Sequence, residues 1–340
     1  MKILLIGGTG FIGRFVIEQL VGSRHEISVL HRGKSAVVIP SSVRSIIEDA
    51  NRLVELRTQL RKLAPDVVIN FILSSGRQAE QMMTALNGIA GRVVALSSMD
   101  VYRACGVLHE TEEGGLQELP LTEESELRTK PAYTPQQLEM GKRIFSWMDD
   151  EYEKIKVERA VLSNSGLPAT ILRLPMVYGP GDPLHRIFPH IKRMHDGRQK
   201  ILLERTIAAW RGSKGFVENV ANAIVLAATH SEAAGRIFNI SEEAALTELE
   251  WARLIAKEMN WDGEFVALPK ERMPAHLSDI GNYSQHWLAS SQRIRQELGF
   301  RETVSRADAI RRTVEWELAN PPAQIPEGMF NYAAEDVALA

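Results

Sequence analysis

The sequence contains a single cysteine, Cys105, among its 340 residues, so no disulfide can form within the chain. Structural disulfides are typical of oxidising compartments, and their exclusion favours a reducing one. Long apolar runs are also missing. The run ILLIGG (3–8) ends in glycines, too short for a signal-peptide core and far short of the ~20 residues of a membrane span. We therefore expect a cytoplasmic protein.

A strong charge of either sign is absent as well. The formal net charge is −3 at pH 7, which disfavours a general nucleic-acid or membrane-surface binder. The histidines show no pair at a credible metal-ligating spacing, and His185, His190 and His195 are five residues apart and share no helical face. We expect neither a metal site nor a nucleophilic role for Cys105, which fits a packed or loop position better.

Apolar runs alternate with amphipathic segments through the first half of the chain. The run KILLIGG (2–8) is typical of a strand buried on both faces of a parallel sheet, and a helical pattern follows it at 11–23. The alternation continues, with strands predicted at 26–32, 44–49, 65–73 and 91–98 and an amphipathic helix at 51–64. It predicts an α/β fold, a Rossmann-type doubly wound parallel sheet with a smaller mixed C-terminal domain.

The stretch GGTGFIG (7–13) stands between the first predicted strand and the first predicted helix. Gly7, Gly10 and Gly13 allow a tight turn, close approach of a pyrophosphate, and close packing of helix on strand. The helix N-terminus offers free N–H groups and a partial positive charge to the phosphates. The motif predicts a dinucleotide site that also includes the residues between the glycines, which are Thr9, Phe11 and Ile12.

The end of the second predicted strand bears on which dinucleotide binds. It reads VLHRGKS, with Arg32 and Lys34 and no carboxylate before Glu48. NAD-binding proteins usually place a carboxylate here for the ribose 2′-hydroxyl. An arginine instead holds a 2′-phosphate with two parallel hydrogen bonds. The sequence therefore favours NADP over NAD, although Arg32 also fits a solvated loop residue.

The stretch DDEYEKIKVERA (149–160) lacks Gly and Pro and is rich in helix formers, which predicts a helix over 149–165. Residues four apart share a helical face, so Tyr152 and Lys156 are expected side by side. The spacing alone also describes a solvated tyrosine beside a surface lysine. Its meaning depends on what the chain builds around it.

With these features together, the chain resembles the extended short-chain dehydrogenase/reductase family, in its epimerase/dehydratase branch. The resemblance covers most of residues 1–318 and rests on motifs in family order. They are GGTGFIG (7–13), LSSMDVY (96–102), YEKIK (152–156), RLPMVYGPGD (173–182), GFVENVANAIVLA (215–227), RIFNIS (236–241) and RIRQELGF (293–300).

The resemblance implies three catalytic residues. Ser98 would hydrogen-bond the reacting oxygen, Tyr152 would be the acid/base, and Lys156 would bind the nicotinamide ribose and lower the Tyr152 pKa. Free tyrosine has a pKa near 10, so work close to neutral pH needs roughly 3 units, or about 4 kcal/mol, of phenolate stabilisation. A cation one helical turn away, with the positive nicotinamide ring, supplies that kind of environment.

Further cofactor contacts follow from the resemblance by position. Asp49 would meet the adenine, and Phe71 and Ile72 would lie where the cofactor passes the fourth strand. Ser97 would face the nicotinamide, and Pro175 would cover it. Ordinary packing at strand ends is the alternative for each of these residues.

Three departures from the family pattern bear on the substrate. Ser98 and Tyr152 are 54 residues apart, about twice the usual separation, because of an excursion at 103–150. Met176 replaces the asparagine typical of members that recognise sugar nucleotides. The usual diphosphate-binding arginine motif reads WRGSKGFVENV here, which leaves Trp210, Arg211 and Lys214 as the candidate substrate residues.

The residues after Ser98 exclude one branch. Sugar 4,6-dehydratases have an Asp-Glu pair at the position of Met99-Asp100, so dehydration is not expected.

The sequence thus predicts an NAD(P)-dependent oxidoreductase or epimerase, acting on a nucleotide sugar or a related hydroxyl or carbonyl compound. An NADPH-dependent carbonyl reductase and a non-catalytic dinucleotide-sensing or RNA-binding relative are the alternatives. We expect a small-molecule substrate and no nucleic-acid or membrane partner; a helix-mediated homodimer would be usual for the family. The predicted domains are 1–172 for the dinucleotide, with 215–240 returning to it, and 173–340 for the substrate, with 103–150 as a surface insertion or lid.

Overall fold

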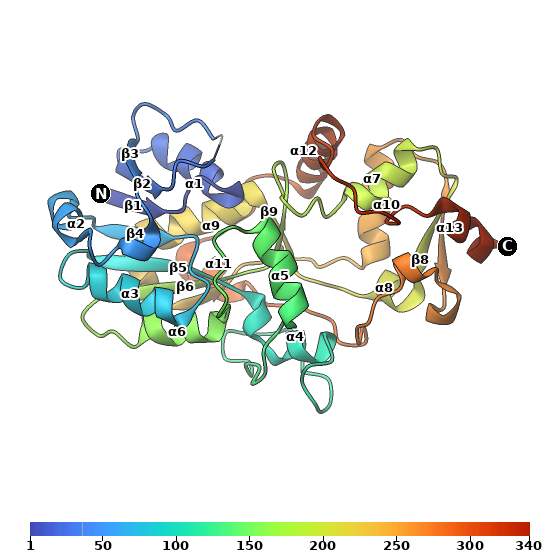
Figure 1. Ribbon diagram of the computed structural model, residues 1–340, viewed down its shortest axis with the longest axis horizontal. Helices are drawn as coiled ribbons and strands as arrows, with labels where there is room; N and C mark the ends of the chain where they lie inside the picture. Colours follow the sequence, from blue (N-terminus) through green and yellow to red (C-terminus); the bar gives the residue numbers. More distant parts are fainter. Residues whose placement is uncertain (36) are drawn as a thin grey trace.

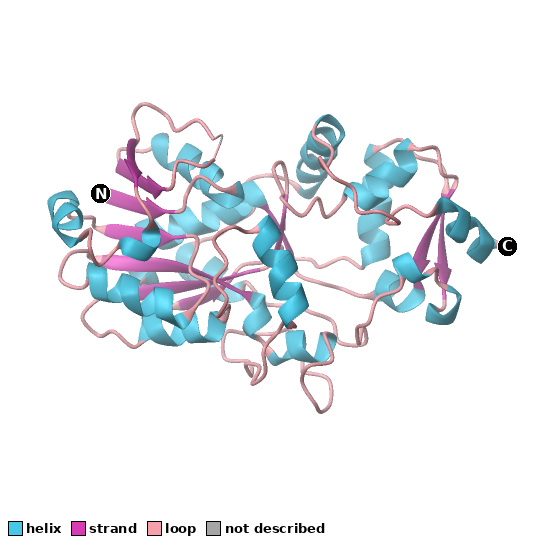
Figure 2. Ribbon diagram, viewed as in Figure 1, coloured by secondary structure: helices cyan, strands magenta, loops and turns pink. Residues whose placement is uncertain are grey.

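A computed structural model describes residues 1–35 and 37–340, arranged as a larger N-terminal lobe around a sheet and a smaller C-terminal lobe (Figures 1 and 2). The sheet has seven strands in the order β10-β6-β5-β4-β1-β2-β3, and every neighbouring pair is parallel. The strands are β1 (Lys2–Ile6), β2 (Glu26–His31), β3 (Arg44–Ile47), β4 (Val67–Asn70), β5 (Arg92–Ser98), β6 (Ala169–Leu174) and β10 (Ile237–Asn239).

The alternating side chains of β1 show why its apolar run is continuous. Ile3 and Leu5 belong to one buried cluster, which includes side chains of α1 (Phe11–Val21) and α9 (Val217–Thr229). Leu4 and Ile6 belong to a second cluster on the other face, with side chains of α2 (Arg57–Leu63), α3 (Gly76–Leu86) and α6 (Lys154–Leu162). Both faces of the sheet are therefore covered by helices, as the sequence predicts.

The connection order reverses at β1, which pairs with β2 on one side and with β4 on the other. In open parallel sheets, ligands bind beyond the carboxyl ends of the strands at such a switch point. The glycine loop follows β1 there. The topology therefore places the predicted dinucleotide motif at the position where this architecture binds ligands.

Two predicted helices differ from the observed ones. The segment 51–64 forms a short 3-10 turn η1 (Ala50–Arg52) and then α2, with the intervening residues as a turn. The helix predicted at 149–165 begins only at Lys154, because the Glu153 side chain caps it by accepting a hydrogen bond from the Ile155 N–H at 3.0 Å. Helix propensity is a weak preference, and tertiary contacts at 149–153 override it.

The C-terminal lobe contains two parallel two-stranded ladders and several helices. β8 (Lys200–Glu204) pairs with β11 (Glu264–Leu268), while β7 (Met176–Tyr178) pairs with β9 (Lys214–Phe216). The helices of this lobe are α7 (Phe188–His195), α8 (Arg205–Ala209), α10 (Glu248–Glu258), α12 (Arg306–Ala319) and α13 (Tyr332–Leu339), with 3-10 turns η4 (Lys270–Arg272) and η5 (Ala275–Leu277). The turn η3 (Ser231–Ala233) and the helix α11 (Gln292–Leu298) lie on the N-terminal lobe instead, where α11 contacts β10 and α9 (Figure 1). Between β9 and β10 the chain runs back to the N-terminal lobe through α9, which packs against α1.

The 103–150 excursion contains α4 (Arg103–Leu108) and α5 (Pro135–Ile144). None of the ten residues of α5 is buried, and Figure 1 shows this helix at the front of the molecule, near its middle. Other parts of the excursion are hydrogen-bonded to the rest of the molecule; Leu121, for example, exchanges backbone hydrogen bonds with residues 288–290. Within the described residues, no helix is long and apolar enough to cross a membrane.

Candidate functional site

The glycines of the loop after β1 occupy three different environments. Gly7 has a φ of +78°, and a Cβ there would lie 2.4 Å from Cγ2 of Ile72. A Cβ on Gly13 would lie 2.2 Å from the carbonyl oxygen of Gly8, so α1 packs directly on the loop. Gly10 precedes α1, and a Cβ on it would meet nothing within 4 Å. The loop therefore has the turn, the close packing and the open approach that a pyrophosphate site needs.

The end of β2 lies beside this loop. Ser35 donates a hydrogen bond from Oγ to the Thr9 carbonyl at 2.8 Å, which ties the β2–β3 connection to the glycine loop. Arg32 is exposed, and its guanidinium donates to Oγ of Ser146 at 2.9 Å and to the Ser146 carbonyl at 3.3 Å. Asp49 follows β3 and caps η1 by accepting from the Asn51 N–H. The present partner of Arg32 is thus the segment before α6, and its role as a phosphate ligand stays a prediction.

A buried lysine lies at the carboxyl ends of β4 and β5. Lys154 is 4% exposed, and its Nζ donates to the carbonyl of Leu96 at 3.1 Å and to that of Leu73. Burial lowers the Lys154 pKa to about 8, against the opposing charges of Asp100 and Glu158. Sequence reasoning missed this residue.

The periodicity of α6 contains the signal that identifies Lys154. Val157 and Val161 are buried, and Lys154 lies three residues before Val157 on the same face. Lys156 is exposed, and its Cβ lies near Gly76 at the start of α3. Because Tyr152 precedes the helix, the structure does not place Tyr152 and Lys156 side by side, and the predicted shared face is wrong. The catalytic role of this pair stays a prediction that the geometry does not support.

The Tyr152 hydroxyl donates a hydrogen bond to Oδ2 of Asp100 at 2.7 Å. Asp100 is 1% exposed, and burial raises its pKa, opposed chiefly by Arg128. Burial and then the Asp100 charge hold the Tyr152 pKa well above its usual value. The prediction that Lys156 lowers the Tyr152 pKa is therefore wrong for this structure. Tyr152 is a proton-bearing phenol paired with a carboxylate.

The two serines at the end of β5 point in different directions. Oγ of Ser98, which is half-buried, accepts a hydrogen bond from the Asp100 N–H at 3.2 Å. Ser97 is buried and donates to Oε1 of Glu158 on α6 at 2.6 Å. Ser97 therefore belongs to the sheet–helix interface and does not face the cofactor side as predicted, because its Oγ is committed to the Glu158 carboxylate. Ser98 stays near Tyr152 through their shared neighbour Asp100.

The remaining predicted cofactor contacts lie around the strand ends. Phe71 and Ile72 follow β4 and are half-buried, and Ile72 touches Gly7. Pro175 joins β6 to β7 and is near enough to Gly215 that a Cβ there would lie 3.0 Å from its Cγ. The structure thus brings Gly7 and Ile72 together at the end of β4. The cofactor contacts of Phe71, Ile72 and Pro175 stay predictions.

Some of the predicted substrate residues are packed inside the lobe, and others lie at its surface. Trp210 is 6% exposed and donates from Nε1 to the Gln285 carbonyl at 2.8 Å, so its ring is packed among its neighbours, and its contact with a substrate stays a prediction. Met176 and Trp210 both pack on Gly212, where a Cβ would lie 2.4 Å from each. Arg211 is exposed. Lys214 forms an ion pair with Glu248.

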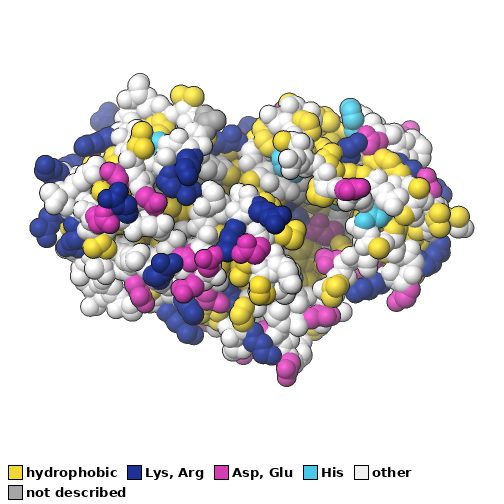
Figure 3. Space-filling model, in the orientation of Figure 1, with side chains coloured by type: hydrophobic (Ala, Val, Ile, Leu, Met, Phe, Trp, Pro, Cys, Tyr) yellow, Lys and Arg dark blue, Asp and Glu magenta, His cyan; other side chains and the backbone are white. Residues whose placement is uncertain are grey.

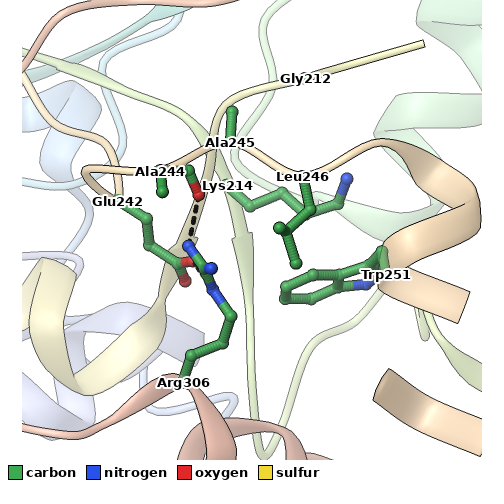
Figure 4. Close-up of a pocket in the computed structure, with 8 residues that line it drawn as sticks. All are labelled: Gly212, Lys214, Glu242, Ala244, Ala245, Leu246, Trp251 and Arg306. Carbon is green, nitrogen blue, oxygen red and sulfur yellow. Dashed lines mark hydrogen bonds and ion pairs between the residues drawn. The ribbon is translucent and has the colours of Figure 1, made fainter. Parts of the chain in front are cut away.

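A small pocket of about 10 Å³ adjoins Lys214 (Figure 4). Its second cation, Arg306, is paired with Glu242 at 2.9 Å, and Trp251 lies under Lys214. Both cations lining the pocket are thus neutralised by carboxylates. Figure 3 shows a broader hollow between the two lobes, with apolar side chains in it and charges of both signs at its rim.

Within residues 1–35 and 37–340, no group of three or more His, Cys, Asp or Glu side chains is arranged to hold a metal ion. Cys105 is buried, and burial raises its pKa well above the usual value, so it is a thiol rather than a thiolate.

A family model described as NAD dependent epimerase/dehydratase family matches residues 3–241. Among curated proteins, the chloroplast stem-loop binding protein of 41 kDa b of Arabidopsis thaliana is 25% identical over 319 residues, covering 88% of this chain and 75% of that protein. The 2'-dehydrokanamycin reductase of Streptomyces kanamyceticus is 23% identical over 349 residues, covering 92% of each. The uncharacterized protein y4nL of Sinorhizobium fredii is 27% identical over 193 residues, about half of either protein (49% and 53%).

Among solved structures, a UDP-glucuronic acid 4-epimerase from Bacillus cereus, in complex with UDP-glucuronic acid and NAD, has a TM-score of 0.68. It is 18% identical, and the match covers 94% of this chain and 99% of that one. At this identity the likeness concerns the fold, and the predicted Rossmann-type fold class is confirmed. The preference for NADP stays a prediction, since the matched family is described as NAD dependent.

Proposed function

Because the chain belongs to the NAD-dependent epimerase/dehydratase family, we propose that it is an NAD(P)-dependent oxidoreductase or epimerase acting on a hydroxyl or carbonyl group of a small molecule. The observation that carries this proposal is the loop after β1. Gly7, Gly10 and Gly13 each have the environment a pyrophosphate site requires, at the switch point of the sheet.

The site residues fit a nicotinamide dinucleotide. The N–H groups at the start of α1 would hold the pyrophosphate, and Lys154 would offer N–H donors to ribose hydroxyls near the ends of β4 and β5. When bound, the nicotinamide supplies or accepts a hydride. Ser98 and Tyr152 would hold the substrate oxygen, since both are hydrogen-bonded to Asp100.

The substrate class is proposed from the relatives and from the pocket beside Lys214. A nucleotide sugar is one candidate, since structural neighbours were solved with UDP-glucuronic acid or UDP-glucose. The pairing of Lys214 with Glu248 and of Arg306 with Glu242 weighs against a diphosphate at that pocket. A simple carbonyl reductase is the second candidate and fits the relative that is named a reductase.

For the cofactor we propose a preference for NADP, on the exposed guanidinium of Arg32 at the end of β2. The test is a fluorescence titration of the purified protein with NADPH and NADH, after release of any cofactor retained from expression. Arg32→Ala should weaken NADPH binding by about tenfold or more and leave NADH binding unchanged, as expected for loss of a charged hydrogen bond. Equal losses for both cofactors would contradict the preference.

Turnover is tested with UDP-glucose for epimerisation and with phenanthrenequinone as a general carbonyl probe. Consumption of NADPH with the quinone supports a reductase. Conversion of UDP-glucose without net cofactor consumption supports an epimerase. Failure to bind either cofactor would overturn the proposed function as a whole.

One observation favours a second candidate, a non-catalytic dinucleotide sensor or RNA-binding relative. Lys156 is exposed and is not beside Tyr152, so the expected catalytic pair is not assembled. A relative is named for stem-loop binding, and Lys and Arg side chains gather along the outer edge of the N-terminal lobe in Figure 3. Cofactor binding without turnover, together with salt-sensitive retardation of an RNA hairpin, would favour this candidate.

A further inference from the structure

Asp100 lies at the centre of a buried polar cluster that includes both hydroxyls of the proposed site. Its backbone N–H donates to Oγ of Ser98, and its Oδ2 accepts from the Tyr152 hydroxyl. The Tyr133 hydroxyl lies 3.5 Å from the same oxygen. Asp100 therefore fixes Ser98 and Tyr152 at once, through different atoms.

The other carboxylate oxygen, Oδ1, is buried and has no hydrogen-bond partner among the described residues. Nη2 of Arg128 is 3.9 Å from it, too far for a hydrogen bond. Arg128 is committed elsewhere, since it binds both carboxylate oxygens of Glu153 at 2.7 Å and donates from Nε to the Asp100 carbonyl. A buried carboxylate with one free oxygen is costly in an inert core.

The directions of these hydrogen bonds assign roles to the hydroxyls. Ser98 accepts from Asp100, so its own proton is left to donate to a substrate oxygen. Tyr152 donates to Asp100, so its oxygen is left to accept a proton from a substrate hydroxyl. The tyrosine is then poised to receive one proton while it gives up another.

We propose that Asp100 is the positioning residue of a proton relay through Tyr152, which takes the place of the tyrosine–lysine pair expected from the sequence. This inference rests on the proposed oxidoreductase function. In the oxidising direction, the proton of a substrate alcohol moves to the Tyr152 oxygen as the Tyr152 proton moves to Oδ2 of Asp100. The C–H electron pair leaves as hydride to the oxidised nicotinamide, and the alcohol becomes a carbonyl. In the reducing direction the same proton returns from Asp100.

The relay explains why a tyrosine with a raised pKa can still exchange protons. Tyr152 carries a proton before and after the transfer, so it need not exist as phenolate. Asp100, whose pKa burial raises, accepts the proton more readily than an exposed aspartate would. The ionisable groups around it, besides Tyr152, are Arg128, Glu153, Lys154, Cys105, His109 and the Tyr133 hydroxyl.

The test follows Tyr152 by NMR, in full-length protein with isotope-labelled tyrosine rings, over a pH titration. The Tyr152 signal is assigned by its loss in Tyr152→Phe. In Asp100→Asn, Tyr152 should titrate at lower pH than in the wild type, because the adjoining negative charge and the acceptor are removed. An unchanged Tyr152 titration would overturn the relay, whether or not the protein proves active.

A matched control is Asp196→Asn, since Asp196 accepts from the Tyr332 hydroxyl at 2.5 Å in the C-terminal lobe. This substitution should change the titration of the Tyr332 signal and leave the Tyr152 titration and the turnover rate unchanged. If Asp100→Asn fails to fold, Tyr152→Phe tests the pair from the other side. Loss of the tyrosine hydrogen bond should then raise the Asp100 pKa further, and an unaltered Asp100 titration would contradict the contact.

Kinetics separate a relay from a purely structural contact. With NADPH and phenanthrenequinone, Asp100→Asn should lower kcat by about a hundredfold or more, change its pH profile, and leave NADPH affinity unchanged. The double variant with Tyr152→Phe should be no slower than Tyr152→Phe alone, because both act on one proton path. Additive losses would overturn the relay, whereas loss of NADPH binding in the wild type would overturn the proposed function instead.

Discussion

Lys154 and Lys156 are separated by one residue and have opposite surroundings. Lys154 is inside the molecule, under the rings of Trp147 and Tyr152, with Nζ 5.4 and 5.8 Å from the two ring centres. Lys156 is exposed. A buried ammonium with only backbone carbonyl partners is an expensive group to keep, which favours a ligand-binding role for Lys154.

The two lysines therefore form a matched pair of substitutions. Lys154→Met should weaken NAD(P)H binding by about tenfold or more, the effect of losing a charged hydrogen bond. Lys156→Met should leave binding and thermal stability close to the wild type. Titration of both variants with NADPH and NADH measures this, and the reverse order would restore the role predicted for Lys156.

Cofactor binding should also depend on pH through Lys154. Its pKa is lowered to about 8 by burial, so the side chain is charged below that pH and neutral above it. The charged form attracts the anionic dinucleotide and supplies more N–H donors, so affinity should fall as the pH rises through about 8. Dissociation constants measured across this range should show the fall in the wild type and not in Lys154→Met.

The sequence supports different parts of the site to different degrees. The glycine loop could be predicted because local spacing alone determines it. The environment of Tyr152 could not, because it depends on Asp100 and Arg128, which come from distant parts of the chain. Arg128 holds Glu153 at the start of α6, and Glu153 caps the helix so that it begins at Lys154, two residues after Tyr152. No local pattern encodes this pairing.

At the scale of elements, the glycines of the loop between β1 and α1 have separate roles, one in stability and another in cofactor binding. Gly13→Ala should destabilise the protein, because its Cβ would lie 2.2 Å from the Gly8 carbonyl oxygen. Gly10→Ala should fold normally, since its Cβ would meet nothing within 4 Å, yet it should weaken binding of the pyrophosphate. Thermal melts and cofactor titrations of the two variants distinguish these effects, and similar melting of both would contradict this division.

The junction of β6 and α6 is held by a buried ion pair. Arg173 donates from Nη2 to Glu158 at 2.7 Å and from Nε at 3.0 Å, and both side chains are almost fully buried. Arg173 also donates to the Tyr102 hydroxyl and to the Glu123 carbonyl in the excursion. The pair thus joins the sheet, a helix and the 103–150 segment.

Glu158→Gln should lower the free energy of unfolding by about 3–5 kcal/mol, because an uncompensated charge is left inside. The control is Glu315→Gln on the surface of α12, where the pair with Arg311 is exposed and worth about 0–1 kcal/mol. Denaturant unfolding of both variants provides the comparison. Equal losses would mean that burial does not decide the value of these pairs.

At the scale of the whole molecule, the N-terminal lobe follows from the alternation of apolar runs and helices, which requires a parallel sheet with covered faces. The smaller lobe was predicted only as a mixed domain, because its strands are short and pair over long sequence separations. β8 and β11, for example, pair in parallel, with Lys200 opposite Glu264 at one end and Glu204 opposite Leu268 at the other. Such pairings leave little trace in local periodicity.

The C-terminal helix α13 is attached through a buried carboxylate. Glu335 is 0% exposed and is bonded by Arg193 at 2.7 Å and by His276 at 3.1 Å. Burial alone would raise the Glu335 pKa, but hydrogen bonds from Arg193 and His276 outweigh it and lower that pKa. Its contribution to stability is therefore present above the pKa of an unfolded glutamate and is lost as the pH falls through the lower, folded value.

Glu335→Gln should consequently make the free energy of unfolding depend less on pH in the acidic range. The difference in melting temperature between wild type and variant should be largest near neutral pH and shrink as the solution becomes acidic. Calorimetry across the acidic range measures this difference. A constant difference would show that α13 is held by packing rather than by charge.

The guanidinium of Arg32 takes part in two interactions, its present contact with Ser146 and the proposed contact with the dinucleotide. Both hydrogen bonds come from the same nitrogen, Nη2, so an anion held there in the same geometry would have to displace the chain before α6. Arrival of the dinucleotide and release of that chain are then a single equilibrium. By thermodynamic linkage, a ligand that stabilises the displaced segment, a substrate included, must raise the affinity for the cofactor by the same factor by which the cofactor raises the affinity for that ligand.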